Sequence, residues 1–134
     1  MRSFFLTLGS IFIVVSGLFH LYVFYLESII WHKPKTWKAF GIPSQEHAEI
    51  IRPMALNQGF YNLFLAVGNL IGIVLLTVNQ TIGFTIAIFS AASMSLAGTV
   101  LFFSAKKSRR GALLQFAPPA LGILFVVIGL QQVR

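Results

Sequence analysis

The chain has 134 residues, of which 57 % are hydrophobic and only 10 % are charged. Soluble globular domains carry about 25 % charged residues, so this composition excludes a soluble enzyme, a nucleic-acid-binding domain and a disordered chain. The net charge of +7 lies in short clusters beside apolar stretches, which is typical of membrane helices flanked by basic residues. The sequence therefore predicts an integral membrane protein, with one membrane domain over residues 1–134.

Four stretches are long and apolar enough to cross a bilayer, which takes about 20 residues. They cover approximately residues 4–31, 54–78, 82–104 and 111–130. The first is too long for a signal peptide and has no small-residue cleavage site, so we interpret it as a membrane span. We therefore expect an all-α fold, a bundle of four transmembrane helices.

The connections between these spans differ in length and composition. Residues 79–81 form a tight hairpin, so the second and third spans should be antiparallel neighbours, and residues 106–110 form a short basic turn. The loop of residues 32–53 interleaves basic and aromatic residues. Beside a membrane helix this pattern indicates an interfacial segment, with Trp37 and Phe40 at the level of the lipid head groups.

The second half of this loop carries the signals of a short helix. The chain turns at Gly41-Ile42-Pro43, and Ser44 is in the position of an N-cap, with Glu46 in the first helical turn. Pro53 either begins the second span or kinks a longer helix.

Basic residues are distributed unevenly between the two sides of the predicted bundle. The two basic connections carry eight of the ten Lys and Arg residues, and the opposite side has only Arg2 and Arg134. Basic loops usually lie in the cytoplasm. We therefore expect a multi-pass protein of the bacterial cytoplasmic membrane with both termini outside.

Polar residues inside the spans are the candidate functional residues, because each is costly in lipid and usually faces the bundle interior or a cavity. In the first span His20 and Glu27 lie seven residues apart, which places them on one face of a helix together with Trp31. Further polar residues are found in the second and fourth spans: Asn57, Gln58, Tyr61, Asn62 and Gln115.

The depths of these residues suggest a shared site. Counted from the basic ends at 1.5 Å per residue, Glu27, Gln58 and Gln115 lie about 6 Å deep and Asn62 about 12 Å. Three helices thus bring polar groups to similar levels of the inner leaflet. This coincidence favours a common polar pocket.

Structural interpretations compete with this hypothesis. Glu27 could be neutralised at the interface by Lys33 or Lys35, and His20 could be a hydrogen-bonded core histidine. The amides of the second span could join helices, for which polar side chains are suited in lipid. Gly68-x-x-x-Gly72 predicts a helix-packing face.

We expect no metal site and no cofactor. The chain has no cysteine, and His32 and His47 lie in the loop, whereas a metal ion needs several well-placed ligands. Motifs of hydrolases, phosphate-binding loops and zinc proteases are missing as well.

A ten-residue run in the second span carries a family resemblance, together with shorter matches in the first span and the loop. The run is Asn57-Gln58-Gly59-Phe60-Tyr61-Asn62-Leu63-Phe64-Leu65-Ala66, and the shorter matches are His20-Leu21-Tyr22, Tyr25-Leu26-Glu27, Trp31 and Phe40. They resemble the bacterial DUF1304 membrane proteins, densely from His20 to Ala66 and more loosely at Gln115 and Pro118-Pro119-Ala120. The resemblance implies a small four-helix membrane protein of unknown function. The third span departs from it, with only Ala97-Gly98 where a glycine-rich stretch is expected.

The main functional hypothesis is a pocket for a small amphipathic or lipid-like molecule, open toward the cytoplasmic leaflet. Glu27 would be the catalytic acid or base and His20 its partner. The ligand would be bound by Trp31, Asn57, Gln58, Tyr61, Asn62 and Gln115. Whether the ligand is only bound or also transformed stays open.

Two alternatives come from other functional classes. A proton-coupled exporter would also need an intramembrane carboxyl group, although such a group is expected nearer the middle of the first helix. An accessory subunit without a ligand needs only the packing surfaces. The expected partners are membrane lipids, a small amphipathic ligand and a second copy of the chain, but not nucleic acid.

Overall fold

The structure is a computed structural model and describes residues 1–132. Within this range every regular element is a helix. The four long helices are α1 (Arg2–Phe24), α4 (Arg52–Leu75), α5 (Gln80–Ser104) and α6 (Arg109–Gln131). Each, with its short extension where there is one, is long and apolar enough to cross a membrane. The all-α, multi-pass architecture predicted from the sequence is confirmed.

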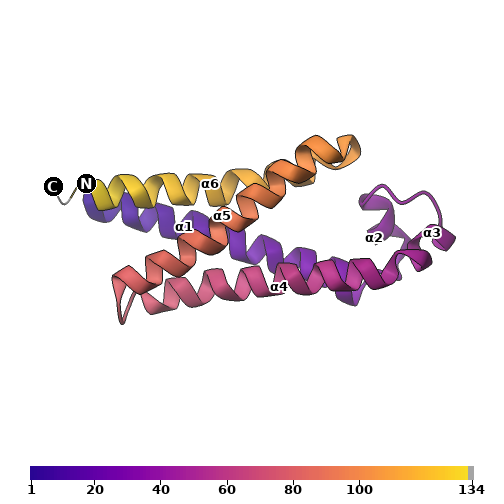
Figure 1. The fold of residues 1–134 in the computed structure, drawn as a ribbon, viewed down its shortest axis with the longest axis horizontal. Helices are drawn as coiled ribbons and strands as arrows, with labels where there is room; N and C mark the ends of the chain where they lie inside the picture. The colour runs from indigo at the N-terminus through magenta and orange to yellow at the C-terminus, as the bar shows by residue number, and fades with distance from the viewer. Residues whose placement is uncertain (133–134) are drawn as a thin grey trace.

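The four helices form a bundle that opens at one end (Figure 1). Helix α1 packs along both α6 and α4, and α5 crosses from α4 to α6. The start of α1, the α4–α5 turn and the end of α6 lie together at one end, whereas the α5–α6 turn and the long loop lie at the other. The predicted antiparallel pairing of the second and third spans is confirmed.

Glycines set how closely these helices approach. A Cβ atom at Gly72 would lie 2.6 Å from the backbone nitrogen of Ala87 on α5, and one at Gly68 would lie 2.7 Å from Ser90 Oγ. The predicted packing face of Gly68 and Gly72 is therefore occupied by α5. In the third span, Gly98 allows α5 to pack against the backbone of α6 in the same way.

The loop after the first span folds into two short helices, α2 (Pro34–Ala39) and α3 (Gln45–Ile50). Gly41, whose φ is +78°, reverses the chain between them. Ser44 caps α3, as expected, since its Oγ accepts a hydrogen bond from the His47 backbone N–H. Pro53 lies in the first turn of α4, so it begins the second span rather than kinking a longer helix.

The two loop helices enclose a small apolar core of their own. It contains Trp31, Trp37, Ala48 and Ala55, with Phe40, Ile42 and Ile51 packed against it. Trp37 is only 4 % exposed. Its ring therefore packs inside the loop, because the turn at Gly41 folds α2 and α3 around it, and the head-group level expected for Trp37 and Phe40 stays a prediction.

Short irregular turns complete the membrane helices. The π-helical turn η1 (Tyr25–Ile29) extends α1, and a 3-10 turn, η2 (Lys106–Ser108), precedes α6. The first membrane-spanning unit therefore ends near Ile29, close to the end predicted for it.

Candidate functional site

Glu27 lies in the π-helical turn η1, at the open end of the bundle. Such a turn places an extra residue in a helix and is frequently found at functional sites. The Glu27 side chain is 7 % exposed. Gly59 of α4 packs against this turn, and a Cβ atom there would lie 3.1 Å from the Cβ atom of Glu27. The glycine thus lets α4 approach the acidic residue.

Asn62 is the residue of α4 that contacts the Glu27 carboxyl group. Its Nδ2 donates one hydrogen bond to Glu27 Oε2 at 2.9 Å and another to the Gln58 backbone oxygen at 3.1 Å. Two acceptors therefore fix the orientation of the amide. Within residues 1–132 no ion pair involves Glu27, so the carboxyl group is not neutralised by Lys33 or Lys35.

A second hydrogen bond joins the turn η1 to α4, one residue after Glu27. Ser28 Oγ donates a hydrogen bond to the Leu56 backbone oxygen at 3.2 Å. This contact and the Asn62 bond hold η1 against the first turns of α4. The carboxyl group is thus positioned by two helices rather than by its own helix alone.

His20 lies deeper in the bundle and is completely buried. Its Nδ1 is 2.9 Å from the Ser16 backbone oxygen. A carbonyl oxygen only accepts hydrogen bonds, so Nδ1 is the donor and Nε2 is the acceptor of the neutral ring. Nε2 has no partner in the described part of the chain. Among the described residues no hydrogen bond joins His20 to Glu27, so the role of His20 as the partner of Glu27 stays a prediction.

Asn69 is a second fully buried polar residue with an unused acceptor. Its Nδ2 contacts Met94 Sδ at 3.8 Å, and its Oδ1 has no partner among the described residues. This oxygen lies 3.1 Å from the position of a Cβ atom on Gly17 of α1. The interface of α1 and α4 therefore contains an unsatisfied acceptor beyond the level of Glu27.

The side chains of the other predicted site residues make no hydrogen bond to the Glu27 carboxyl group. Asn57, Gln58 and Tyr61 are exposed on α4, and Gln115 is half-buried on α6. Trp31 belongs to the loop core, where its Nε1 donates to the Ala48 backbone oxygen at 2.9 Å. Of the predicted set, Asn62 is thus the one that the fold brings to Glu27.

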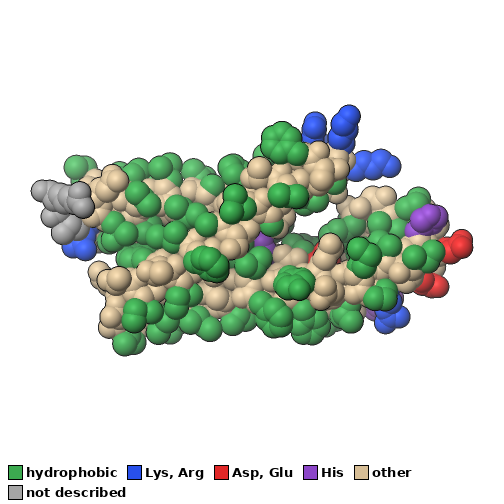
Figure 2. All heavy atoms as spheres, viewed as in Figure 1, with side chains coloured by type: hydrophobic (Ala, Val, Ile, Leu, Met, Phe, Trp, Pro, Cys, Tyr) green, Lys and Arg blue, Asp and Glu red, His purple; other side chains and the backbone are tan. Residues whose placement is uncertain are grey.

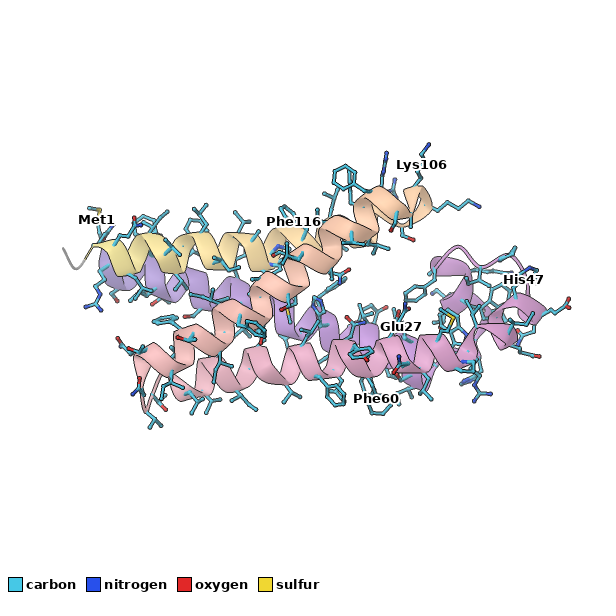
Figure 3. The ribbon with its side chains drawn as sticks, in the orientation of Figure 1. Met1, Glu27, His47, Phe60, Lys106 and Phe116 are labelled. Carbon is cyan, nitrogen blue, oxygen red and sulfur yellow. The ribbon has the colours of Figure 1, made fainter. Side chains whose placement is uncertain are left out.

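The surface around Glu27 is hollowed. Figure 2 shows an opening between two parts of the bundle. One part is the end of α5 with the basic α5–α6 turn, and the other is the start of α4 with the loop. Figure 3 places Glu27 on the α1–α4 side of this opening. At its outer edge the side chain of Lys107 approaches the loop, with its Cδ 3.7 Å from the position of a Cβ atom on Gly41.

Two features of this region were not among the site residues predicted from the sequence. Helical spacing places Asn69, seven residues after Asn62, on the same face, but its predicted depth in the outer half of the membrane keeps it out of the set expected at the level of Glu27. The π turn has no comparable signal in the local sequence; Ser28 and Glu27 in this turn lie against Gly59 of the distant helix α4.

Comparison with known proteins identifies a family but no characterised relative. Residues 14–127 match the sequence model of a family described as "Protein of unknown function (DUF1304)". The matched range includes Glu27 and Asn62 as well as His20 and Asn69. No curated protein and no solved structure matches the chain.

Proposed function

The chain belongs to the DUF1304 family, and for this member we propose a site beside Glu27 that binds or transforms a small amphipathic or lipid-like molecule. One observation carries the proposal. The buried Glu27 carboxyl group, set in a π turn, has a hydrogen bond from Asn62 and no cation within ion-pair distance among the described residues. Ionisable groups inside a membrane are costly, so they are functional-site candidates by default.

The roles we propose follow from these contacts. Glu27 is the acid or base that meets the polar part of the ligand, and Asn62 orients its carboxyl group. The apolar part of the ligand would lie against the membrane helices that border the hollow seen in Figure 2. His20, Trp31, Asn57, Gln58, Tyr61 and Gln115 remain proposed site residues, although none of their side chains is hydrogen-bonded to Glu27.

We also propose an orientation in the bacterial cytoplasmic membrane. The hollow lies at the end that carries the two basic connections, and these hold eight of the ten Lys and Arg residues. Basic connections usually face the cytoplasm. The Glu27 site would therefore lie in the cytoplasmic leaflet, with both termini outside.

The Glu27→Gln variant tests the proposed site. Glutamine keeps the shape and an oxygen for the Asn62 hydrogen bond but removes the exchangeable carboxyl proton. We expect a folded protein that has lost the stabilisation by a bound amphiphile, measured as melting temperature in detergent across a panel of single-chain lipids. Glu46→Gln, on the exposed face of α3, is the matched control.

The outcomes separate a ligand site from a structural contact. If Glu27→Gln keeps the ligand-dependent shift in melting temperature, the proposed site is wrong. If the variant changes the stability without any amphiphile, and no amphiphile stabilises the wild type, Glu27 and Asn62 only join two helices. That result would favour an accessory subunit.

A proton-coupled exporter is the second candidate function, favoured by the unpartnered acceptors of His20 and Asn69. Both atoms are fully buried and lie beyond Glu27 in the bundle, where a polar route across the membrane would need such groups. Purified protein in vesicles with an imposed proton gradient tests this function. Flux of an amphiphilic cation that depends on the gradient and is lost in Glu27→Gln would establish it over the binding site alone.

A further inference from the structure

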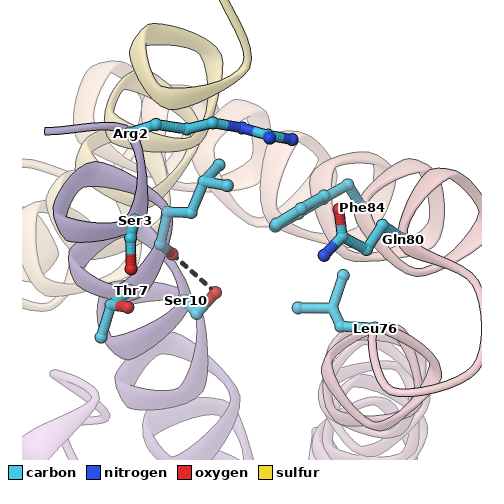
Figure 4. A pocket seen from close by; sticks show the side chains of 8 residues that line it. Arg2, Ser3, Thr7, Ser10, Leu76, Gln80 and Phe84 are labelled. Carbon is cyan, nitrogen blue, oxygen red and sulfur yellow. Dashed lines mark hydrogen bonds between the residues drawn. The ribbon is translucent and has the colours of Figure 1, made fainter. Parts of the chain in front are cut away.

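A second polar site lies at the opposite end of the bundle, beside the start of α1 and the α4–α5 turn. A cavity of about 440 Å³ opens there between three helices (Figure 4). This volume is within the usual range for ligand sites. The residues that matter for its chemistry are Arg2, Ser3, Thr7, Leu76, Gln80 and Phe84.

An apolar groove continues from this cavity along α5. A neighbouring cavity of about 670 Å³ shares Arg2, Gln80 and Phe84 with the first. It runs on past Ile88 and Ala92, and Leu130 of α6 contributes to its wall. A polar cavity thus passes directly into an apolar groove on the membrane-facing surface.

The polar cavity has unused hydrogen-bond donors and a positive charge. Arg2 extends over the cavity from α1 toward Gln80 and Phe84 (Figure 4). Ser10 is satisfied, because its Oγ donates to the Leu6 backbone oxygen at 2.8 Å. The side chains of Ser3, Thr7 and Gln80 make no hydrogen bond to another residue between 1 and 132.

The electrostatics of this end favour an anion. Among residues 1–132, no acidic residue lines either cavity. Helix α5 begins at Gln80, and a helix N-terminus adds partial positive charge from its free N–H groups. Asn79 Oδ1 accepts a hydrogen bond from the Ile82 backbone N–H. The backbone N–H groups of Gln80 and Thr81 do not take part in this cap.

We propose that this end binds an anionic phospholipid. The phosphate of the lipid lies between the Arg2 guanidinium and the side-chain amide of Gln80. One acyl chain lies in the groove past Ile88 and Ala92. A guanidinium group forms strong, charge-assisted hydrogen bonds with phosphate oxygens. The continuous polar and apolar surfaces match the two parts of such a lipid. This inference is independent of the proposed Glu27 site.

Native mass spectrometry of the detergent-solubilised protein tests the proposal. The probes are phosphatidylglycerol, which is anionic, and phosphatidylcholine with the same acyl chains, which is zwitterionic. We expect preferential retention of phosphatidylglycerol, reduced about tenfold in Arg2→Gln by loss of a charged hydrogen bond. Arg110→Gln is the matched control, since Arg110 is exposed at the opposite end and the charge change is the same.

A second variant tests the groove rather than the charge. Ala92→Leu fills the space proposed for the acyl chain and leaves Arg2 in place, so it should also reduce retention of phosphatidylglycerol. Glycerol phosphate, which has no acyl chains, should not displace the lipid at equal concentration.

Specific results would overturn the proposal. These are equal retention of both lipids, undiminished retention in Arg2→Gln, an equal loss in Arg110→Gln, or undiminished retention in Ala92→Leu. Displacement by glycerol phosphate would replace the phospholipid with a free phosphate compound as the ligand. Melting curves of each variant without lipid show whether a loss of retention comes from unfolding.

Discussion

Trp31 and Trp37 occupy the same small core in the loop but differ in their hydrogen bonding. They are 5 % and 4 % exposed, respectively. Trp31 Nε1 donates to the Ala48 backbone oxygen at 2.9 Å, whereas Trp37 Nε1 is buried without a partner among the described residues. The two indoles therefore differ in what their N–H groups contribute to stability.

We predict that Trp31→Phe is more destabilising than Trp37→Phe. Both changes shorten a buried aromatic side chain, but only the first removes a hydrogen bond and leaves the Ala48 carbonyl without its indole donor. A difference of about 1 kcal/mol is expected. Thermal unfolding of the two variants in the same detergent measures it. Equal stabilities would mean that the Trp31 hydrogen bond contributes nothing.

At the scale of the helices, α4 and α5 approach each other closely at Gly72. The Cβ atom of any other residue would lie 2.6 Å from the Ala87 backbone nitrogen and 2.8 Å from the Ala87 Cβ. These are backbone and β-carbon positions, so the helices would have to separate. At Gly68 the nearest atom is the Ser90 hydroxyl oxygen, which can rotate away.

Larger residues at Gly72 and Gly68 should therefore destabilise the protein to different extents. Gly72→Leu should destabilise the detergent-solubilised protein by about 1–3 kcal/mol through overpacking, and Gly68→Ala should cost less. The half-exposed Ile71 offers the control Ile71→Leu, which changes side-chain shape on the lipid-facing surface. A melting temperature of Gly72→Leu equal to that of the wild type would contradict the packing of α4 against α5.

For the whole molecule, the two ends of the bundle differ in charge. Eight basic residues lie in the loop and the α5–α6 turn, and the other end has Arg2. The remaining basic residue, Arg134, also counted in the prediction of orientation, lies outside the described residues. The start of α1 and the α4–α5 turn lie at the same end of the bundle, because two membrane spans, α1 and α4, separate them in the chain.

Reporter fusions test the orientation proposed from this asymmetry. A reporter that is active only in the cytoplasm should be silent when it is fused after Arg134. The same reporter inserted in the α5–α6 turn, after Ser108, should be active. The reverse pattern would place the Glu27 site in the outer leaflet.

The amino-acid sequence by itself determined the fold class and the order of the helices. Long apolar runs must become helices in lipid, because every backbone N–H and C=O group needs a partner there. Ser44 acts locally as an N-cap, so its role could be predicted from neighbouring residues alone, whereas only the structure decided that Pro53 begins the second span rather than kinking a longer helix. The depths of Glu27 and Asn62 in the membrane stay predictions from the rise of a helix per residue.

Only the tertiary structure decided which of these polar residues meet. Helical spacing placed Gln58 and Asn62 on one face of α4 and His20 and Glu27 on one face of α1, but it left the rotation of each helix open. In the folded chain Gly59 lies against η1, Asn62 reaches Glu27 and His20 bonds to its own helix. Trp31 lies in the loop core and not beside Glu27. Local sequence patterns could not predict this, because contacts between distant segments depend on tertiary packing.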